Sequence, residues 1–185
     1  MAVDTNQNVY ITGRYYSSLQ FNSTYHGGSG NYDSYIAKYN SSGEWEWAKR
    51  MQCACSLTAD SLVIDSDNNL YVGGAYNSGM ALFGSISVTP VGGSWDAYLA
   101  KYNQSGEVIW AQGMGGAGMD YTHDLAIGGD GKIVAALGLG SAATLGPQTH
   151  TSQGGDDIIL LTFSRDYDRD GFPDSIDLDD DDDFI

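Results

Sequence analysis

Regularly spaced carboxylates near the C-terminus are the residues of this chain best suited to chemistry. Residues 166 to 177 have the sequence DYDRDGFPDSID. A twelve-residue Ca²⁺ loop has a characteristic pattern of oxygen ligands. Carboxylates stand at positions 1, 3, 5, 9 and 12, glycine stands at position 6, and position 7 contributes its main-chain carbonyl. The predicted ligands are Asp166, Asp168, Asp170, Phe172 through its carbonyl, Asp174 and Asp177. We expect modest affinity, because Asp177 replaces the longer Glu usual at position 12.

The acidic run continues past this loop. No helix-forming segment flanks it, which disfavours a helix–loop–helix EF-hand. Residues 166–183 instead resemble the thrombospondin type 3 repeat, a family that wraps around a string of Ca²⁺ ions with little regular secondary structure. The resemblance implies a second site beginning with Asp177, Asp179, Asp181 and Asp183, although Phe184 stands where that family has glycine. The alternative is a disordered, solubilising acidic tail.

The charge of the chain limits its partners. The net charge is −16, and residues 165–185 alone hold ten Asp and two Arg. Such acidity disfavours nucleic acids and anionic membrane surfaces and makes divalent cations natural partners. No run of 18 apolar residues is present, so no membrane insertion is expected. The chain also shows no signal-peptide pattern.

Two sequence blocks recur along the rest of the chain. DSYIAKYNSSG begins at Asp33, DAYLAKYNQSG at Asp96, and a weaker DIILLTF at Asp157. Upstream of each stand NVYITGRY, NLYVGGAY and KIVAALGL, and the offsets between copies are 61 and 63 residues. A period this long, with short apolar runs and 25 glycines, predicts repeated antiparallel sheets such as propeller blades.

Each copy is expected to form four strands. In the second copy these are Ser61–Asp65, Leu70–Tyr76, Asp96–Tyr102 and Glu107–Met114. Glycine turns connect the third and fourth strands, and a longer excursion separates the second and third. The excursions contain Leu19–Thr24, Leu82–Val88 and Leu145–Thr149, each a candidate extra hairpin. The fold class is therefore all-β, with about three four-stranded blades in residues 1–164 and an irregular calcium-binding segment in residues 165–185.

These motifs resemble the SBBP type of β-propeller repeat over about residues 2–163. Such repeats occur in secreted and surface proteins of bacteria and archaea, so the resemblance implies an extracellular or cell-surface location. The third copy departs from the pattern, because Leu137 replaces the glycine of positions 13 and 74 and no Trp-bearing strand follows Phe163. Three copies cannot close a propeller of four to eight blades. Because Met1 aligns inside a repeat, we expect a fragment whose start, including any signal peptide, is truncated.

Other candidate residues are interpreted as structural. Cys53 and Cys55 are expected to be unpaired loop cysteines, because a disulfide two residues apart is strained. The segment Asp65–Asn69 is expected to be a turn. Asp33, Asp96 and Asp157 are expected to hydrogen-bond the preceding glycine turns.

Two recurring aromatic positions are assigned to blade packing: Tyr39, Tyr102 and Phe163 occupy one, and Trp47 and Trp110 the other. Glu44 and Glu46 are read as solvated surface acids, and His26, His123 and His150 lack ligand spacing.

The sequence thus predicts a non-enzymatic fragment of a secreted or surface repeat protein. Its propeller-like body would serve binding, adhesion or display, with an extracellular protein or polysaccharide as ligand, and Ca²⁺ would stiffen the acidic linker. The alternative is a fragment of an extracellular propeller enzyme, a polysaccharide lyase or hydrolase whose active site lies in further blades. Such an enzyme needs asymmetric polar residues converging on the central channel, and the sequence shows no such cluster.

Overall fold

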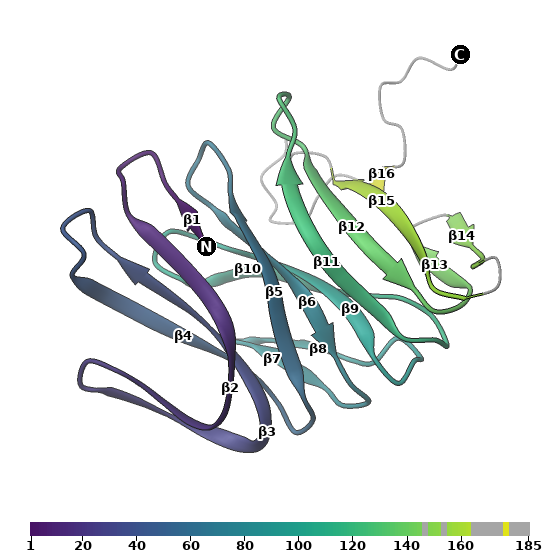
Figure 1. The fold of residues 1–185 in the computed structure, drawn as a ribbon, viewed down its shortest axis with the longest axis horizontal. Coiled ribbons are helices and arrows are strands. Elements are labelled where there is room, and N and C mark those ends of the chain that lie inside the picture. Colours follow the sequence, from purple (N-terminus) through teal and green to yellow (C-terminus); the bar gives the residue numbers. More distant parts are fainter. Residues whose placement is uncertain (146–147, 153–154, 164–175, 178–185) are drawn as a thin grey trace.

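The structure is a computed structural model that describes residues 1–145, 148–152, 155–163 and 176–177 of the 185-residue chain. The described residues form strands and turns and contain no helix, which confirms the all-β prediction. Consequently they contain no helix long and apolar enough to cross a membrane. Among the described residues, three antiparallel sheets of four or six strands stand side by side in chain order, an arrangement compatible with part of a propeller, and a fourth sheet has two strands (Figure 1).

Each sheet is built mainly from one copy of the repeat. The first copy supplies β1 (Ala2–Val3), β2 (Val9–Phe21), β3 (Thr24–Tyr39) and β4 (Trp45–Cys53). The second copy supplies β5 (Leu57–Ile64), β6 (Leu70–Tyr76), β9 (Asp96–Tyr102) and β10 (Val108–Met114). The third copy supplies β11 (Asp120–Ile127), β12 (Ile133–Leu139), β15 (Asp157–Phe163) and β16 (Ile176–Asp177). The strands predicted for the second copy are confirmed, with a first strand that starts earlier than expected.

The inserted hairpins lie between the second and third strands, as the excursions predicted. They are β7 (Ala81–Phe83) with β8 (Ile86–Val88), and β13 (Ala143–Leu145) with β14 (Gln148–His150). In the first copy β2 and β3 themselves continue to a tip between Phe21 and Thr24, past a bulge at Ser17 that has a φ of 75°.

One expectation about the sheets is wrong. The predicted four-stranded blades, one for each copy, are not separate, because the β7–β8 hairpin of the second copy pairs with β4 of the first and makes a six-stranded sheet, with Cys53 opposite Ala81. The same contact recurs one copy later, where Gly116 bridges to Ala143. The insertion is long enough to reach back, and its backbone groups satisfy the otherwise open outer edge of the preceding sheet. The hairpins therefore tie successive copies together.

The connecting turns repeat almost atom for atom. Asn40 Oδ1 accepts the main-chain N–H groups of Ser42 and Glu44, and its amide donates to the Glu44 carboxylate at 2.8 Å. Asn103 makes the same bonds to Ser105 and Glu107. This agreement confirms the turn predicted from the NSSG and NQSG segments.

The core lies between the sheets. Sheets one and two bury Tyr10, Ile36 and Met51 against Leu57, Leu70 and Val72. Sheets two and three bury a second cluster, whose members are Tyr71, Ala97, Leu99, Trp110, Leu125, Ile133, Leu137 and Phe163. The first and second sheets are thus each covered by the next copy. Tyr102, Phe163 and Trp110 lie in these clusters and Trp47 packs beside the first, as predicted, whereas Tyr39 is only partly buried and belongs to neither cluster.

The fourth strand of the third sheet, β16, is only two residues long. β16 pairs with β15 through Phe163 opposite Ile176 and Thr162 opposite Asp177. In the second sheet the corresponding residues, Tyr102 and Lys101, pair with β10. Two residues of the acidic segment therefore take the place of the missing Trp-bearing strand.

Candidate functional site

The predicted calcium segment is anchored at one end to the third sheet. The backbone of Asp177, the twelfth position of the loop, pairs with Thr162 in β15. The other predicted ligands and the expected domain boundary at residue 164 lie outside the described residues; those ligands are Asp166, Asp168, Asp170, Phe172, Asp174, Asp179, Asp181 and Asp183. Carboxylate and carbonyl oxygens are the hard ligands that Ca²⁺ prefers, so the chemistry of this donor set suits the ion.

Acidic residues elsewhere serve the turns. Asp65 Oδ1 accepts the N–H groups of Asp67 and Asn69 at 2.9 and 2.8 Å, so the segment is the predicted turn. Within the described part of the chain, His, Cys, Asp and Glu side chains form no group of three that could hold a metal ion. Glu44 bonds Asn40 and Glu46 pairs with Lys38 at 2.8 Å, so these two acids have separate partners.

Buried aspartates recur at one position of the repeat, at the start of β9 for Asp96 and within the longer β3 for Asp33. Asp33 is fully buried and accepts the Ser29 N–H at 2.8 Å and Arg50 Nη2 at 2.7 Å. Asp96 is also fully buried and accepts the N–H groups of Val91 and Gly93. Hydrogen bonding to the preceding glycine turn is therefore confirmed at Asp96, whose carboxylate fixes the loop that returns the chain to the second sheet. Asp33 bonds Ser29 beside the glycines of the first copy, but this segment is part of β3 and not a turn.

Two buried aspartates have pKa values shifted in opposite directions. Burial opposes ionisation of Asp4, but bonds from Asn8, Asn6 and Tyr10 outweigh it and lower its pKa below the usual 3.8. Asp120 accepts fewer bonds, and burial raises its pKa above 3.8 despite N–H donors from Gly116 and Gly140. The charged form is therefore stabilised by folding at Asp4 and destabilised at Asp120.

This difference predicts opposite pH responses. Asp4→Ala should lower the free energy of unfolding at pH 7 by roughly 1.5–3 kcal/mol, the usual range for hydrogen bonds to a charged group. Because the folded pKa of Asp4 is depressed, its contribution is present above about pH 3.8 and is lost as pH falls through the folded value. Urea unfolding at pH 7 and about pH 3 should show the wild-type advantage shrinking. An unchanged advantage, or the same trend for Asp120→Asn, would contradict this assignment.

The prediction of unpaired cysteines is wrong. Cys53 and Cys55 are joined by a disulfide with Cα atoms 4.7 Å apart, inside the range that disulfides adopt. The pairing is possible because β4 ends at Cys53 and the chain bends there. The bridge lies at the junction of two copies, since a Cβ on Gly79 would come within 2.9 Å of Cys55 Cβ. Nothing in the residue spacing revealed this bend.

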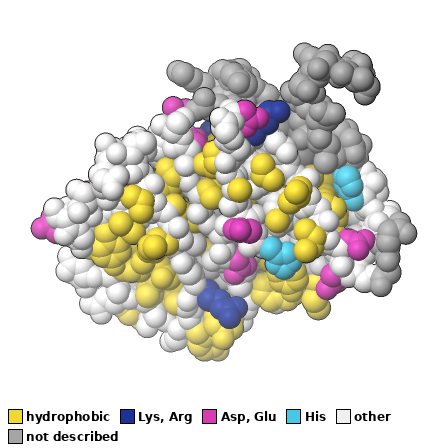
Figure 2. Space-filling view, turned by 45° about the horizontal axis from the view of Figure 1, so that its top comes forward, with side chains coloured by type: hydrophobic (Ala, Val, Ile, Leu, Met, Phe, Trp, Pro, Cys, Tyr) yellow, Lys and Arg dark blue, Asp and Glu magenta, His cyan; other side chains and the backbone are white. Residues whose placement is uncertain are grey.

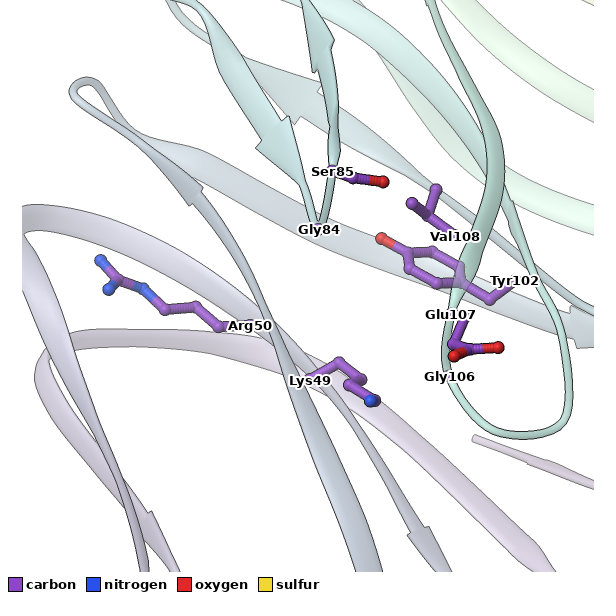
Figure 3. Close-up of a pocket in the computed structure, with 8 residues that line it drawn as sticks. All are labelled: Lys49, Arg50, Gly84, Ser85, Tyr102, Gly106, Glu107 and Val108. Carbon is purple, nitrogen blue, oxygen red and sulfur yellow. The ribbon is translucent and has the colours of Figure 1, made fainter.

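A cavity of about 320 Å³ opens between the first and second sheets. The buried Tyr102 hydroxyl has no hydrogen-bond partner among the described atoms, and burial raises its pKa. Lys49, Ser85 and Glu107 also line the cavity, whereas Arg50 points away from the others (Figure 3). These groups can hydrogen-bond a polar ligand. The lining holds no histidine to activate the serine as a nucleophile.

The histidines lie on different elements. His26 is in β3, His123 in β11 and His150 in β14. Burial lowers the pKa of His26, with Arg50 adding to the effect. His123 stacks on Tyr121, with ring centroids 6.0 Å apart. The three side chains therefore do not converge on one site.

Comparison with known proteins supports the repeat fold. No family model matches the chain. Over 114 residues it is 32% identical to the regulatory protein FlaEY of Caulobacter vibrioides, a match covering 60% of this chain and 12% of that protein. Over 149 residues it is 27% identical to an uncharacterized WD repeat-containing protein of Acanthamoeba polyphaga mimivirus, covering 72% of this chain and 11% of the relative. The chain thus spans little more than a tenth of each relative.

The WD-repeat similarity agrees with three sheets in series. A WD repeat forms four strands in about 40–45 residues. The copies here are offset by 61 and 63 residues because a hairpin is inserted between the second and third strands. A β-propeller-like repeat scaffold is the coarse description that the fold and the WD repeat-containing relative support.

Proposed function

We propose that this chain is a non-enzymatic part of a secreted or cell-surface repeat protein. In this proposal SBBP-type blades form a rigid body for binding, adhesion or display. A thrombospondin type 3-like segment follows and becomes stiff when Ca²⁺ binds. The observation that carries the proposal is positional repetition, since equivalent residues of successive copies fill the same buried positions and the same turns.

The repetition favours a scaffold role because the most strongly held polar groups serve the architecture. Asp96 and Asp120 accept N–H groups from the loops that precede β9 and β11, and Asp33 accepts the Ser29 N–H within β3. Asn40 and Asn103 accept N–H groups in the connecting turns. In a scaffold of this kind, the ligand-binding residues lie on loops, and the sheets that support the loops keep the same structure. The ligand class proposed is an extracellular protein or polysaccharide.

The calcium role rests on residue spacing and on one anchored backbone position. Five carboxylates at loop positions 1, 3, 5, 9 and 12 repel one another without a cation. Pairing of Asp177 with β15 holds the last of these positions beside the third sheet. Ca²⁺ would neutralise the repulsion and fix the loop against the body.

Isothermal titration calorimetry of the full chain tests the calcium role. We expect Ca²⁺ to bind with micromolar to millimolar affinity and Mg²⁺ to bind poorly, because Mg²⁺ dehydrates reluctantly and requires a tight octahedron. Asp170→Ala should weaken Ca²⁺ binding by at least tenfold through loss of a ligand at position 5. The matched control Asp67→Ala removes one charge from an exposed turn and should leave binding unchanged.

Two results would overturn the calcium role. One is the absence of a binding heat at about 5 mM Ca²⁺, beyond the weak end of the range for extracellular calcium modules. The other is equal affinity for wild type, Asp170→Ala and Asp67→Ala, which would mean diffuse attraction by an acidic tail.

A further inference from the structure

Each sheet has two faces with different neighbours. We call the face turned toward the following copy the trailing face and the face turned toward the preceding copy the leading face. On the first sheet, Tyr10 and Ile36 lie on the trailing face and are fully buried by the second sheet. On the second sheet, Ala97 and Leu99 lie on the trailing face and are fully buried by the third sheet. Trailing faces are thus covered wherever a following sheet is present.

The trailing face of the third sheet is apolar and exposed. Ile158 and Leu160 are 73% and 64% exposed. They occupy the positions of Ala97 and Leu99, since Leu139 pairs with Asp157 as Tyr76 pairs with Asp96. Half-buried Val134 and Ala136 lie beside them on β12. Figure 2 shows hydrophobic side chains gathered over the third sheet, beside a histidine.

The leading face of the first sheet offers a matching surface. Phe21 packs on Tyr35 with ring centroids 5.1 Å apart, as Phe83 packs on Tyr98 at 4.7 Å in the second copy. Val9, Ile11 and Tyr39 on this face are only half buried. Their counterparts in the second copy, Leu70, Val72 and Tyr102, belong to the cluster packed against the first sheet. The first sheet therefore carries the type of face that covers a trailing face elsewhere in the chain.

We propose that the trailing face of the third sheet docks the leading face of the first sheet of a second copy of this chain. The contact would continue the packing already seen between sheets one and two and between sheets two and three. Two copies bring six sheets, which lies within the four to eight blades of closed propellers. A head-to-tail contact that closes gives a ring with two identical junctions, so the expected product is a cyclic dimer.

Sedimentation velocity of the full chain tests the proposal. At about 100 μM, where a micromolar interface is almost fully occupied, wild type should sediment as a dimer. Leu160→Asp places a charge on the trailing face, and therefore in both junctions of the ring, and should make the chain monomeric at this concentration. Leu160 is 64% exposed, so this variant should fold, which a thermal melt followed by circular dichroism verifies. The control Val91→Asp, at another exposed apolar position, should still dimerise.

Mixing variants tests whether the contact is head to tail. Tyr39→Asp alters the leading face and should also be monomeric, with Val9→Asp as a second choice if the first does not fold. An equimolar mixture of Tyr39→Asp and Leu160→Asp chains keeps one intact junction per pair, so dimers should return at reduced affinity. A monomeric wild type, dimeric Leu160→Asp, or a mixture that stays monomeric would each refute the proposal. None of these results depends on Ca²⁺ binding.

Discussion

Trp110→Ala is expected to lower the free energy of unfolding by about 3–5 kcal/mol, the range for truncating a buried tryptophan. Trp110 is 2% exposed and packs edge-on against Tyr71, with ring centroids 6.2 Å apart, in the cluster between the second and third sheets. Removing the indole leaves a cavity in the packing between the second and third sheets. The midpoint of urea unfolding, followed by far-ultraviolet circular dichroism, measures the loss.

Trp47→Ala provides the matched control. Trp47 holds the same repeat position and contacts Tyr10 in the same edge-on manner at 6.0 Å, but it is only partly buried. Because less apolar surface leaves water at this site, its truncation should cost less than that of Trp110. Equal stability of Trp110→Ala and wild type would show that this tryptophan is not part of the blade packing.

The strands could be predicted because the same pattern of apolar residues and turns recurs in successive copies. The apolar runs around Ile36 and Leu99 recur between glycine turns, and a strand buried on both faces has this pattern. The role of Asp96 also followed from its fixed place after a glycine-rich excursion. Comparing the copies within the chain thus distinguished residues that recur for structural reasons from residues that differ between copies.

Other features could not be predicted because they depend on contacts between copies. The excursion around Phe83 indicated a hairpin, but its pairing with β4 depends on how the two sheets lie in space. The disulfide between Cys53 and Cys55 depends on a bend at the end of β4, which residue types do not specify. For the predicted calcium segment, the spacing of Asp166 to Asp177 predicts ligand oxygens, whereas the pairing of Asp177 with β15 could be seen only in the backbone.

Leu137 of the third copy stands at a position that is glycine in the first two copies, and the residue paired with this position in the neighbouring strand also differs. Gly74 lies opposite Tyr98 in the second sheet, and Gly13 lies opposite Tyr35 in the first. In the third sheet the opposing pair is Leu137 and Ile159. The Tyr98 hydroxyl donates to the Thr58 carbonyl at 2.9 Å, and a Cβ on Gly74 would collide with that carbonyl. Glycine and tyrosine therefore form one packing unit, and leucine with isoleucine forms another.

A double-mutant cycle should reveal this coupling. Gly74→Leu overpacks the site and is expected to cost at least about 3 kcal/mol, because main-chain atoms of Thr58 and Ala59 block the new side chain. Tyr98→Ile removes the ring and the hydroxyl that hold the Thr58 carbonyl in place. The double variant reproduces the pair of the third sheet, so its cost should fall below the sum of the single costs by about 1–3 kcal/mol.

Pairing Gly74→Leu with Tyr102→Ile controls for nonspecific relaxation of the core. Tyr102 is as buried as Tyr98 but lies opposite Leu70, four residues from Gly74 along β6. Removing its ring gives no space at Gly74, so these two costs should add. Urea unfolding of the six proteins of the two cycles decides between the outcomes. Additive costs for Gly74→Leu with Tyr98→Ile would mean that the two residues vary independently, and that the third sheet accommodates Leu137 through a shift of its first strand instead.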